Sequence, residues 1–181
     1  MAQNRFAIIA IGNVLQKDDG MGVLAARYLR VNYIFEPALE IIEGGVEGMN
    51  LLNTIMDYDE ILFLDCIDIE GESGTIYNIP ITELKTSALV KGSAHEIGLL
   101  ESLSMLELMG ETVPPSTLLA IVPDVIETGI GLSTILRKSF DTYVTTIMKI
   151  ILERGYSTRL AANSLSFEDV VQSFSTALSP R

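Results

Sequence analysis

Short, almost purely apolar runs that alternate with amphipathic segments constrain the fold of this 181-residue chain more than any other feature. Residues 6–11 (FAIIAI) and 60–67 (EILFLDCI) are too short for buried helices, so they predict strands that are buried on both faces. The segments between such runs carry apolar residues three and four positions apart, which is typical of helices that pack on a sheet. This alternation predicts an α/β fold.

The predicted sheet has about five strands. We expect strands at residues 6–11, 39–43, 60–67, 74–81 and 116–122, and helices at residues 18–33, 48–58, 95–109 and 131–155. Residues 82–94 are expected to form a loop or a broken helix. The fourth strand follows the third too closely for a helical crossover, so it should be antiparallel. The expected architecture is a three-layer sandwich, with a twisted, mostly parallel central sheet flanked by helices.

The end of the chain differs in composition from the rest. Residues 157–166 are small and polar, and a single apolar stripe follows them: Phe167, Val170, Val171, Phe174 and Leu178. The Ser166-x-x-Asp169 spacing resembles a capping box and predicts a short helix. We therefore expect a main domain over residues 1–156 and a C-terminal extension over residues 157–181. The extension is expected to dock on the domain, in preference to serving as a partner-binding helix.

Charge and the rare residue types exclude several functions. Acidic side chains number 24 and basic ones 12, and this net charge of −12 argues against nucleic acid and anionic membranes as partners. It also disfavours self-association, so we expect a monomer. A single cysteine excludes an internal disulfide, and a single histidine excludes sites that need two imidazoles. The first apolar run is too short for a signal or spanning segment, so we expect a cytoplasmic protein.

Three polar residues fall where an open parallel sheet places its sites, outside the carboxyl ends of the strands. Asp19 follows the first strand, Asp65 ends the apolar part of the third, and His95 opens a predicted helix. Two carboxylates and one imidazole form a plausible ligand set for a divalent metal, with positions left open for substrate. We expect such a site to hold metal only weakly.

Each candidate also has a purely structural interpretation. Asp18 and Asp19 stand where a helix needs an N-cap, and capping is the more frequent role of either residue alone. Asp65 could be a paired structural aspartate, and His95 a histidine at a helix start. The neighbours of Asp65 are easier to assign. We expect Asp68 to be a loop acid, and Cys66 to be a small core residue on the face of the strand opposite Asp65.

A dinucleotide fingerprint is a competing interpretation of the same region. Gly20, Gly22 and Ala25 fit the pattern G-x-G-x-x-A, and Glu40 and Glu43 follow about twenty residues later. However, eight residues separate the strand end from Gly20, and two aspartates would face the pyrophosphate. The pattern therefore favours a dinucleotide site only weakly.

Several blocks, in order, resemble the hydrogenase maturation proteases, the endopeptidases that trim the large subunit of nickel–iron hydrogenases. The blocks are IGNVLQKDDGMGV (11–23), EGGVEGM (43–49), LDCI (64–67), SAHEIGL (93–99), and VP (122–123) with GL (131–132). The resemblance extends over about residues 6–155. It departs from the family pattern at Ala10, often Gly in the family, at Asp19, often Glu, and at Val46, often Thr.

The resemblance implies a function and a site. The metal-binding positions of the family fall on Asp19, Asp65 and His95, which are then also the expected catalytic residues. The implied reaction removes a C-terminal peptide from a large-subunit precursor whose nickel is already inserted, so the nickel comes from the substrate. The hydrolytic step could use a metal-polarised carbonyl and water, or an aspartate as general base. Three alternatives stay open: a non-enzymatic nickel-binding checkpoint, a dinucleotide-binding protein and a plain interaction domain.

Overall fold

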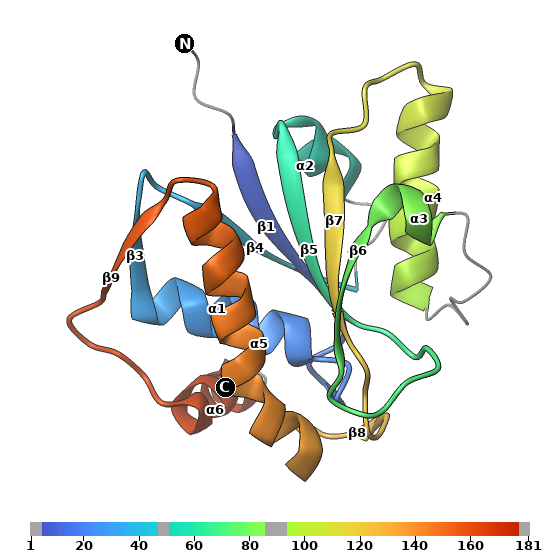
Figure 1. Cartoon of the computed structure of the whole chain (residues 1–181). Coiled ribbons are helices and arrows are strands. Elements are labelled where there is room, and N and C mark those ends of the chain that lie inside the picture. Colours follow the sequence, from blue (N-terminus) through green and yellow to red (C-terminus); the bar gives the residue numbers. More distant parts are fainter. Residues whose placement is uncertain (1–4, 47–50, 86–93, 178–181) are drawn as a thin grey trace.

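A computed structural model describes residues 5–46, 51–85 and 94–177 and shows one five-stranded sheet at the centre of the molecule (Figure 1). The strand order is β4-β1-β5-β7-β6, with β1, β4, β5 and β7 parallel and β6 antiparallel to β7. The bounds are β1 Phe6–Ile11, β4 Glu40–Gly45, β5 Glu60–Cys66, β6 Ile76–Pro80 and β7 Ser116–Ile121. The mostly parallel sheet and its one antiparallel strand are as predicted.

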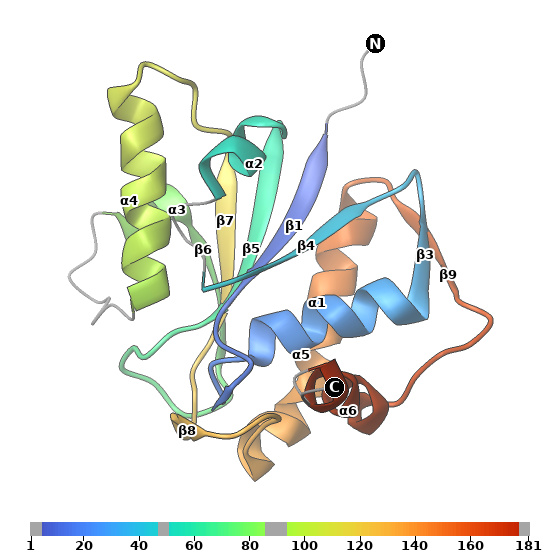
Figure 2. The same cartoon turned by 180° about the vertical axis from the view of Figure 1, so that it is seen from behind.

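Helices cover both faces of this sheet, so the expected three layers are present (Figures 1 and 2). One face carries α1 and α5, with α6 packed against them, and the other carries α2, α3 and α4. Their bounds are α1 Met21–Asn32, α2 Leu52–Met56, α3 Ile81–Leu84, α4 Ala94–Leu108, α5 Thr134–Glu153 and α6 Phe167–Ala177.

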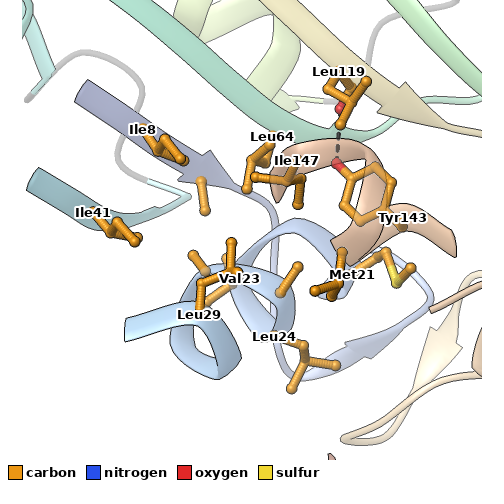
Figure 3. Packing of buried hydrophobic residues seen from close by; sticks show 14 of the residues in the cluster. Ile8, Met21, Val23, Leu24, Leu29, Ile41, Leu64, Leu119, Tyr143 and Ile147 are labelled. Atoms are coloured by element: carbon orange, nitrogen blue, oxygen red, sulfur yellow. Dashed lines mark hydrogen bonds between the residues drawn. The ribbon is translucent and has the colours of Figure 1, made fainter. Parts of the chain in front are cut away.

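Two apolar cores lie on the two sides of the sheet. Strand alternation divides β5 between them, because Leu64 and Cys66 belong to the core under α1 and α5, whereas Phe63 belongs to the core under α4. Figure 3 shows part of the first core, which includes Ile8 of β1, Leu64 of β5 and Ile147 of α5. Every residue of β1 is buried, as expected for a strand that pairs with a strand on each side in a sheet covered by helices.

Two short antiparallel ribbons were not predicted from the sequence. In one, β3 (Tyr33–Glu36) pairs with β9 (Ser157–Leu160), and in the other β2 (Gln16–Lys17) pairs with β8 (Glu127–Thr128). Most residues of β9 are exposed and none is buried, so its sequence carries no apolar alternation to indicate a strand.

Two helices begin later than predicted, because turns and caps set their first residues. The helix expected at residues 18–33 begins only at Met21, and the helix expected at residues 131–155 begins at Thr134, because Ser133 caps it through a bond from Leu136 N to Ser133 Oγ (3.2 Å). The short α3 falls where a loop or broken helix was expected. Residues 47–50 and 86–93, which include parts of two predicted segments, lie outside the described residues.

The predicted C-terminal helix docks on the rest of the chain. Phe167, Val170 and Phe174 of α6 are buried in the same core as α1 and α5. The guanidinium of Arg27 lies 4.4 Å from the ring centroid of Phe174, and that of Arg137 lies at the same distance over Phe167. Leu178, the last residue of the predicted stripe, lies outside the described residues.

The capping box at the start of α6 forms as the spacing predicted. Asp169 N donates to Ser166 Oγ (3.1 Å), and Ser166 N donates to Asp169 Oδ2 (3.1 Å). The Ser166 hydroxyl also donates to Asp169 Oδ2 (2.6 Å), and this bond, followed by the one from Ser166 N, lowers the pKa of the exposed Asp169 carboxyl. The box fixes the entry of the chain into α6 and so aligns its apolar face with the core.

Replacing Gly22 by alanine should destabilise the protein, although alanine is the better helix former by about 0.5–1 kcal/mol. A β-carbon at Gly22 would lie 2.6 Å from the carbonyl oxygen of Leu64 and 3.1 Å from that of Ile11. We expect Gly22→Ala to lower the free energy of unfolding by about 2 kcal/mol, as measured by urea unfolding. An unchanged or raised value would contradict the close approach of α1 to the sheet.

Replacing Ser166 by alanine should remove one half of the capping box. We expect Ser166→Ala to cost about 1 kcal/mol of stability and to raise amide hydrogen exchange in the first turn of α6. Ser164→Ala is the matched control, because Ser164 is exposed and lies outside the box. Equal exchange in the two variants would show that the box does not hold the helix start.

Candidate functional site

Asp19 lies at the end of the β1–α1 loop (residues 12–20) and is 5% exposed. Its Oδ2 accepts a hydrogen bond from Asn13 N (2.8 Å), so the side chain folds back over its own loop. The N-cap of α1 is Gly20, and no side chain caps the helix. The capping interpretation of Asp18 and Asp19 is therefore wrong, because the loop turns both carboxylates away from the first helical amides.

Gly12 is the point at which Asp19 and Asp65 come together. It adopts a φ of 122°, and a β-carbon there would lie 2.1 Å from the carbonyl oxygen of Asp19 and 3.7 Å from Oδ1 of Asp65. Any side chain at this position would therefore clash with the backbone of Asp19. The backbone of Asp19 and the carboxylate of Asp65 therefore both lie beside Gly12, at the edge of the sheet where β1 and β5 end.

Asp65 lies one residue before the end of β5 and is fully buried. Its Oδ1 accepts a hydrogen bond from Cys66 N at 2.7 Å. Alternation along β5 places Asp65 on the face of Phe63, and Cys66 on the opposite face, where it is a small core residue as expected. Asp68 is exposed in the following loop, also as expected.

His95 lies in the first turn of α4, and its side chain is outside the described part of the structure. Two observations bear on its placement. Helix α4 packs through Leu99 and Leu103 on the core that contains Phe63, the face of β5 to which Asp65 belongs. Figure 1 also shows that α4 begins at the carboxyl end of the parallel strands, where α1 begins as well. The third predicted ligand therefore starts its helix at the same edge.

The donor set suits a borderline divalent cation. Among the side chains that the structure describes, no group of three His, Cys, Asp or Glu residues could hold a metal ion, and the side chain of His95 is not among them. Asp19 and Asp65 both lie at this edge of the sheet, and each would contribute one carboxylate group to the candidate set. Such hard donors with one imidazole bind metal less tightly than three imidazoles do, and they leave positions open for substrate.

Of two further residues near the site, the sequence pattern did not single out the first and gave the second a different role. The first, Tyr143 of α5, is fully buried, and its hydroxyl donates to the carbonyl oxygen of Leu119 at 2.7 Å (Figure 3). Burial, and then the negative charge of Asp65, raises the pKa of Tyr143 well above its usual value. The second, Asp18, directs its carboxylate into a different loop. In sequence, the first looks like an apolar helix position and the second like a helix cap.

The geometry also removes the dinucleotide interpretation. Gly22 packs against the backbone of β1 and β5, so it cannot approach a pyrophosphate. Glu43, one of the two acids that follow the glycine pattern, accepts two hydrogen bonds from Arg27 (both 2.6 Å) and pairs with Arg30 at 2.7 Å. The hydrogen bond to Glu43 raises the pKa of Arg27. This acid is therefore part of an ion pair between β4 and α1.

Within the described residues, no helix combines the length and the apolar character that a membrane span requires. The longest helix, α5, has 20 residues and alternates buried with exposed positions. It is an amphipathic helix on the sheet.

Comparison with known proteins extends these observations. Residues 23–150 match the family model described as "HycI: Hydrogenase maturation protease". The hydrogenase 2 maturation protease of Escherichia coli K12 is 28% identical over 152 residues, which cover 83% of this chain and 93% of the relative. The structure of the hydrogenase maturating endopeptidase HybD from E. coli superimposes with a TM-score of 0.79 at 27% identity, over 87% of this chain and 98% of that one. The [NiFe] hydrogenase maturation protease HybD from Thermococcus kodakarensis gives a TM-score of 0.66 at 28% identity, over 81% and 98%.

The three-layer fold, the acidic edge of its sheet and these likenesses define an α/β endopeptidase. More particularly, the chain belongs to the hydrogenase maturation protease family. The matched range ends at residue 150, so β9 and α6 lie beyond the part that the family model describes.

Replacing Tyr143 by phenylalanine should remove the hydrogen bond to Leu119 and cost about 1 kcal/mol at pH 7. The pKa of Tyr143 in the folded protein lies above the value of 10.0 for a free side chain. Its contribution is therefore fully present below pH 10 and is lost as the pH rises further, because the unfolded chain loses the proton first. We expect wild-type stability, measured by urea unfolding, to fall faster above about pH 10 than that of Tyr143→Phe, by up to about 1.4 kcal/mol per pH unit. Parallel curves would contradict the burial of a neutral hydroxyl.

Proposed function

We propose that this endopeptidase removes the C-terminal peptide from the large-subunit precursor of a nickel–iron hydrogenase after nickel has been inserted. Asp19, Asp65 and His95 recognise the nickel that the precursor carries. The family membership supports the reaction class, and the single observation that carries the site is that the backbone of Asp19 and the carboxylate of Asp65 both lie beside Gly12. The start of α4 at the same edge of the sheet supports the choice of His95 as the third residue.

The proposed roles follow from the chemistry of the side chains. Two carboxylates and an imidazole can complete the coordination of a cation that is already held by another protein, and their limited affinity favours a loaded substrate over free metal. The same carboxylates lie beside the bond to be cut, where one of them can accept a proton from the attacking water. Nickel can polarise the scissile carbonyl while it is bound to both proteins.

The direct test is mass spectrometry of a hydrogenase large-subunit precursor after incubation with this protein, with and without nickel loading. We expect a discrete C-terminal peptide to be lost only from the loaded precursor. Binding of the loaded precursor without any cleavage would instead support a non-enzymatic checkpoint, and cleavage that ignores nickel would contradict nickel recognition.

Neutralising one carboxylate should identify the site within that assay. We expect Asp65→Asn and Asp19→Asn to slow cleavage roughly hundredfold or more, because metal ligation contributes several kcal/mol to such reactions. Asp68→Asn is the matched control, an exposed aspartate three residues from Asp65, and it should cleave at the wild-type rate. Full activity of Asp65→Asn would refute the assignment.

A further inference from the structure

Asp18 is a fully buried carboxylate that uses both of its oxygens on a distant loop. Oδ2 accepts hydrogen bonds from Asp124 N and Val125 N, each at 3.1 Å, and Oδ1 accepts one from Ser133 N at 2.6 Å. The backbone of Asp18 adds another bond, from its own N to the carbonyl oxygen of Val125 (2.8 Å). These contacts tie the first and last parts of the β7–α5 loop (residues 122–133) to the β1–α1 loop.

The middle of the β7–α5 loop is held as well. Glu127 and Thr128 pair with Lys17 and Gln16 in the β2–β8 ribbon, and Gly129 N donates to the carbonyl oxygen of Leu15 at 2.8 Å. The amino group of Lys17 also pairs with Glu127 at 3.3 Å. The loop is therefore fixed along its length, although it belongs neither to the five-stranded sheet nor to a helix.

This loop borders the candidate site on two sides. It leaves β7 directly after Ile121, which pairs with Cys66, and Ala120 pairs with Asp65 itself. Its anchor, Asp18, is the residue next to Asp19. The β7–α5 loop thus connects the strand beside one candidate ligand to the loop that carries the other.

The outer side of this fixed region exposes large aliphatic side chains. Ile126 on the β7–α5 loop is 54% exposed, and Leu15 on the β1–α1 loop is 45% exposed. A buried carboxylate is costly unless it is fully hydrogen-bonded, so anchoring a loop in this way is favourable where the loop must hold one shape. A preorganised loop that presents apolar groups beside a reactive centre is suited to bind an extended polypeptide.

We propose that the β7–α5 loop is a docking wall for the substrate polypeptide next to the bond that is cut, and that Asp18 is its positioning residue. This inference rests on the proposed function. Ile126 contacts an apolar stretch of the precursor, and Asp18 acts only through the loop. Loss of either should weaken substrate binding more than it slows the chemical step.

Steady-state cleavage of the nickel-loaded precursor tests this proposal with two variants. One changes the buried anchor of the loop, and the other changes its exposed apolar side chain. Asp18→Asn places an amide group among backbone N–H donors and frees the loop, whereas Ile126→Ser leaves the anchor intact. We expect each to raise KM about tenfold and to leave kcat within about threefold. Amide hydrogen exchange at residues 124, 125 and 133 should increase in Asp18→Asn alone, and Asp18→Glu, which keeps the charge, should restore part of the protection.

Leu152→Ser is the matched control, since Leu152 has a similar exposure of 48% but lies near the far end of α5. Its KM should equal that of the wild type.

An unchanged KM in Ile126→Ser would overturn the docking wall, and a loss of kcat alone in Asp18→Asn would show that Asp18 acts through Asp19. If the wild-type protein cleaves no precursor, the proposed function fails. Docking is then tested separately, by comparing the affinities of the wild type and Ile126→Ser for the precursor. Weaker binding by Ile126→Ser would then support the wall, and equal binding would overturn it.

Discussion

The contact between the first turn of α1 and the ends of β1 and β5 is the constraint on which the site depends. Gly22 allows the helix to approach the carbonyl oxygens of both strands, and Gly12 allows the preceding loop to pass between Asp19 and Asp65. With side chains at these two positions, the helix would move outward and the loop could not close. The core beneath α1 and the placement of Asp19 and Asp65 at one edge of the sheet are therefore set by the same backbone approach.

Two neighbouring aspartates illustrate how one loop serves both structure and chemistry. Asp18 is surrounded by backbone donors from the β7–α5 loop, and Asp19 turns back toward Asn13 and the edge of the sheet. Both are almost completely buried in a protein with a net charge of −12. Burial of two adjacent carboxylates is favourable only because each has its own hydrogen-bond donors. The loop thus separates an anchoring charge from a charge directed toward the site.

The sequence predicted the sheet and the position of Asp19 and Asp65 near the ends of β1 and β5, because both follow from local pattern and one topological rule. Apolar runs specify buried parallel strands, and the carboxyl ends of such strands meet at one edge. Other features had no local signal. The amide partners of Asp18 lie 106 or more residues away, so its role was mistaken for a cap. Tyr143 occupies an ordinary apolar helix position, and β9 forms an exposed ribbon with β3 that no alternation predicts.

The pairing of β9 with β3 brings the last part of the chain to one of the first elements to be made. Asn32, at the end of α1, also exchanges hydrogen bonds with Leu165, and α6 then completes the core beside α1. During synthesis, these surfaces of α1 and β3 stay uncovered until β9 and α6 have left the ribosome, because nothing else among the described residues occupies them. The core beside α1 is therefore completed late in synthesis, and a translation product truncated before β9 would expose apolar surface to the chaperones and proteases of the cell.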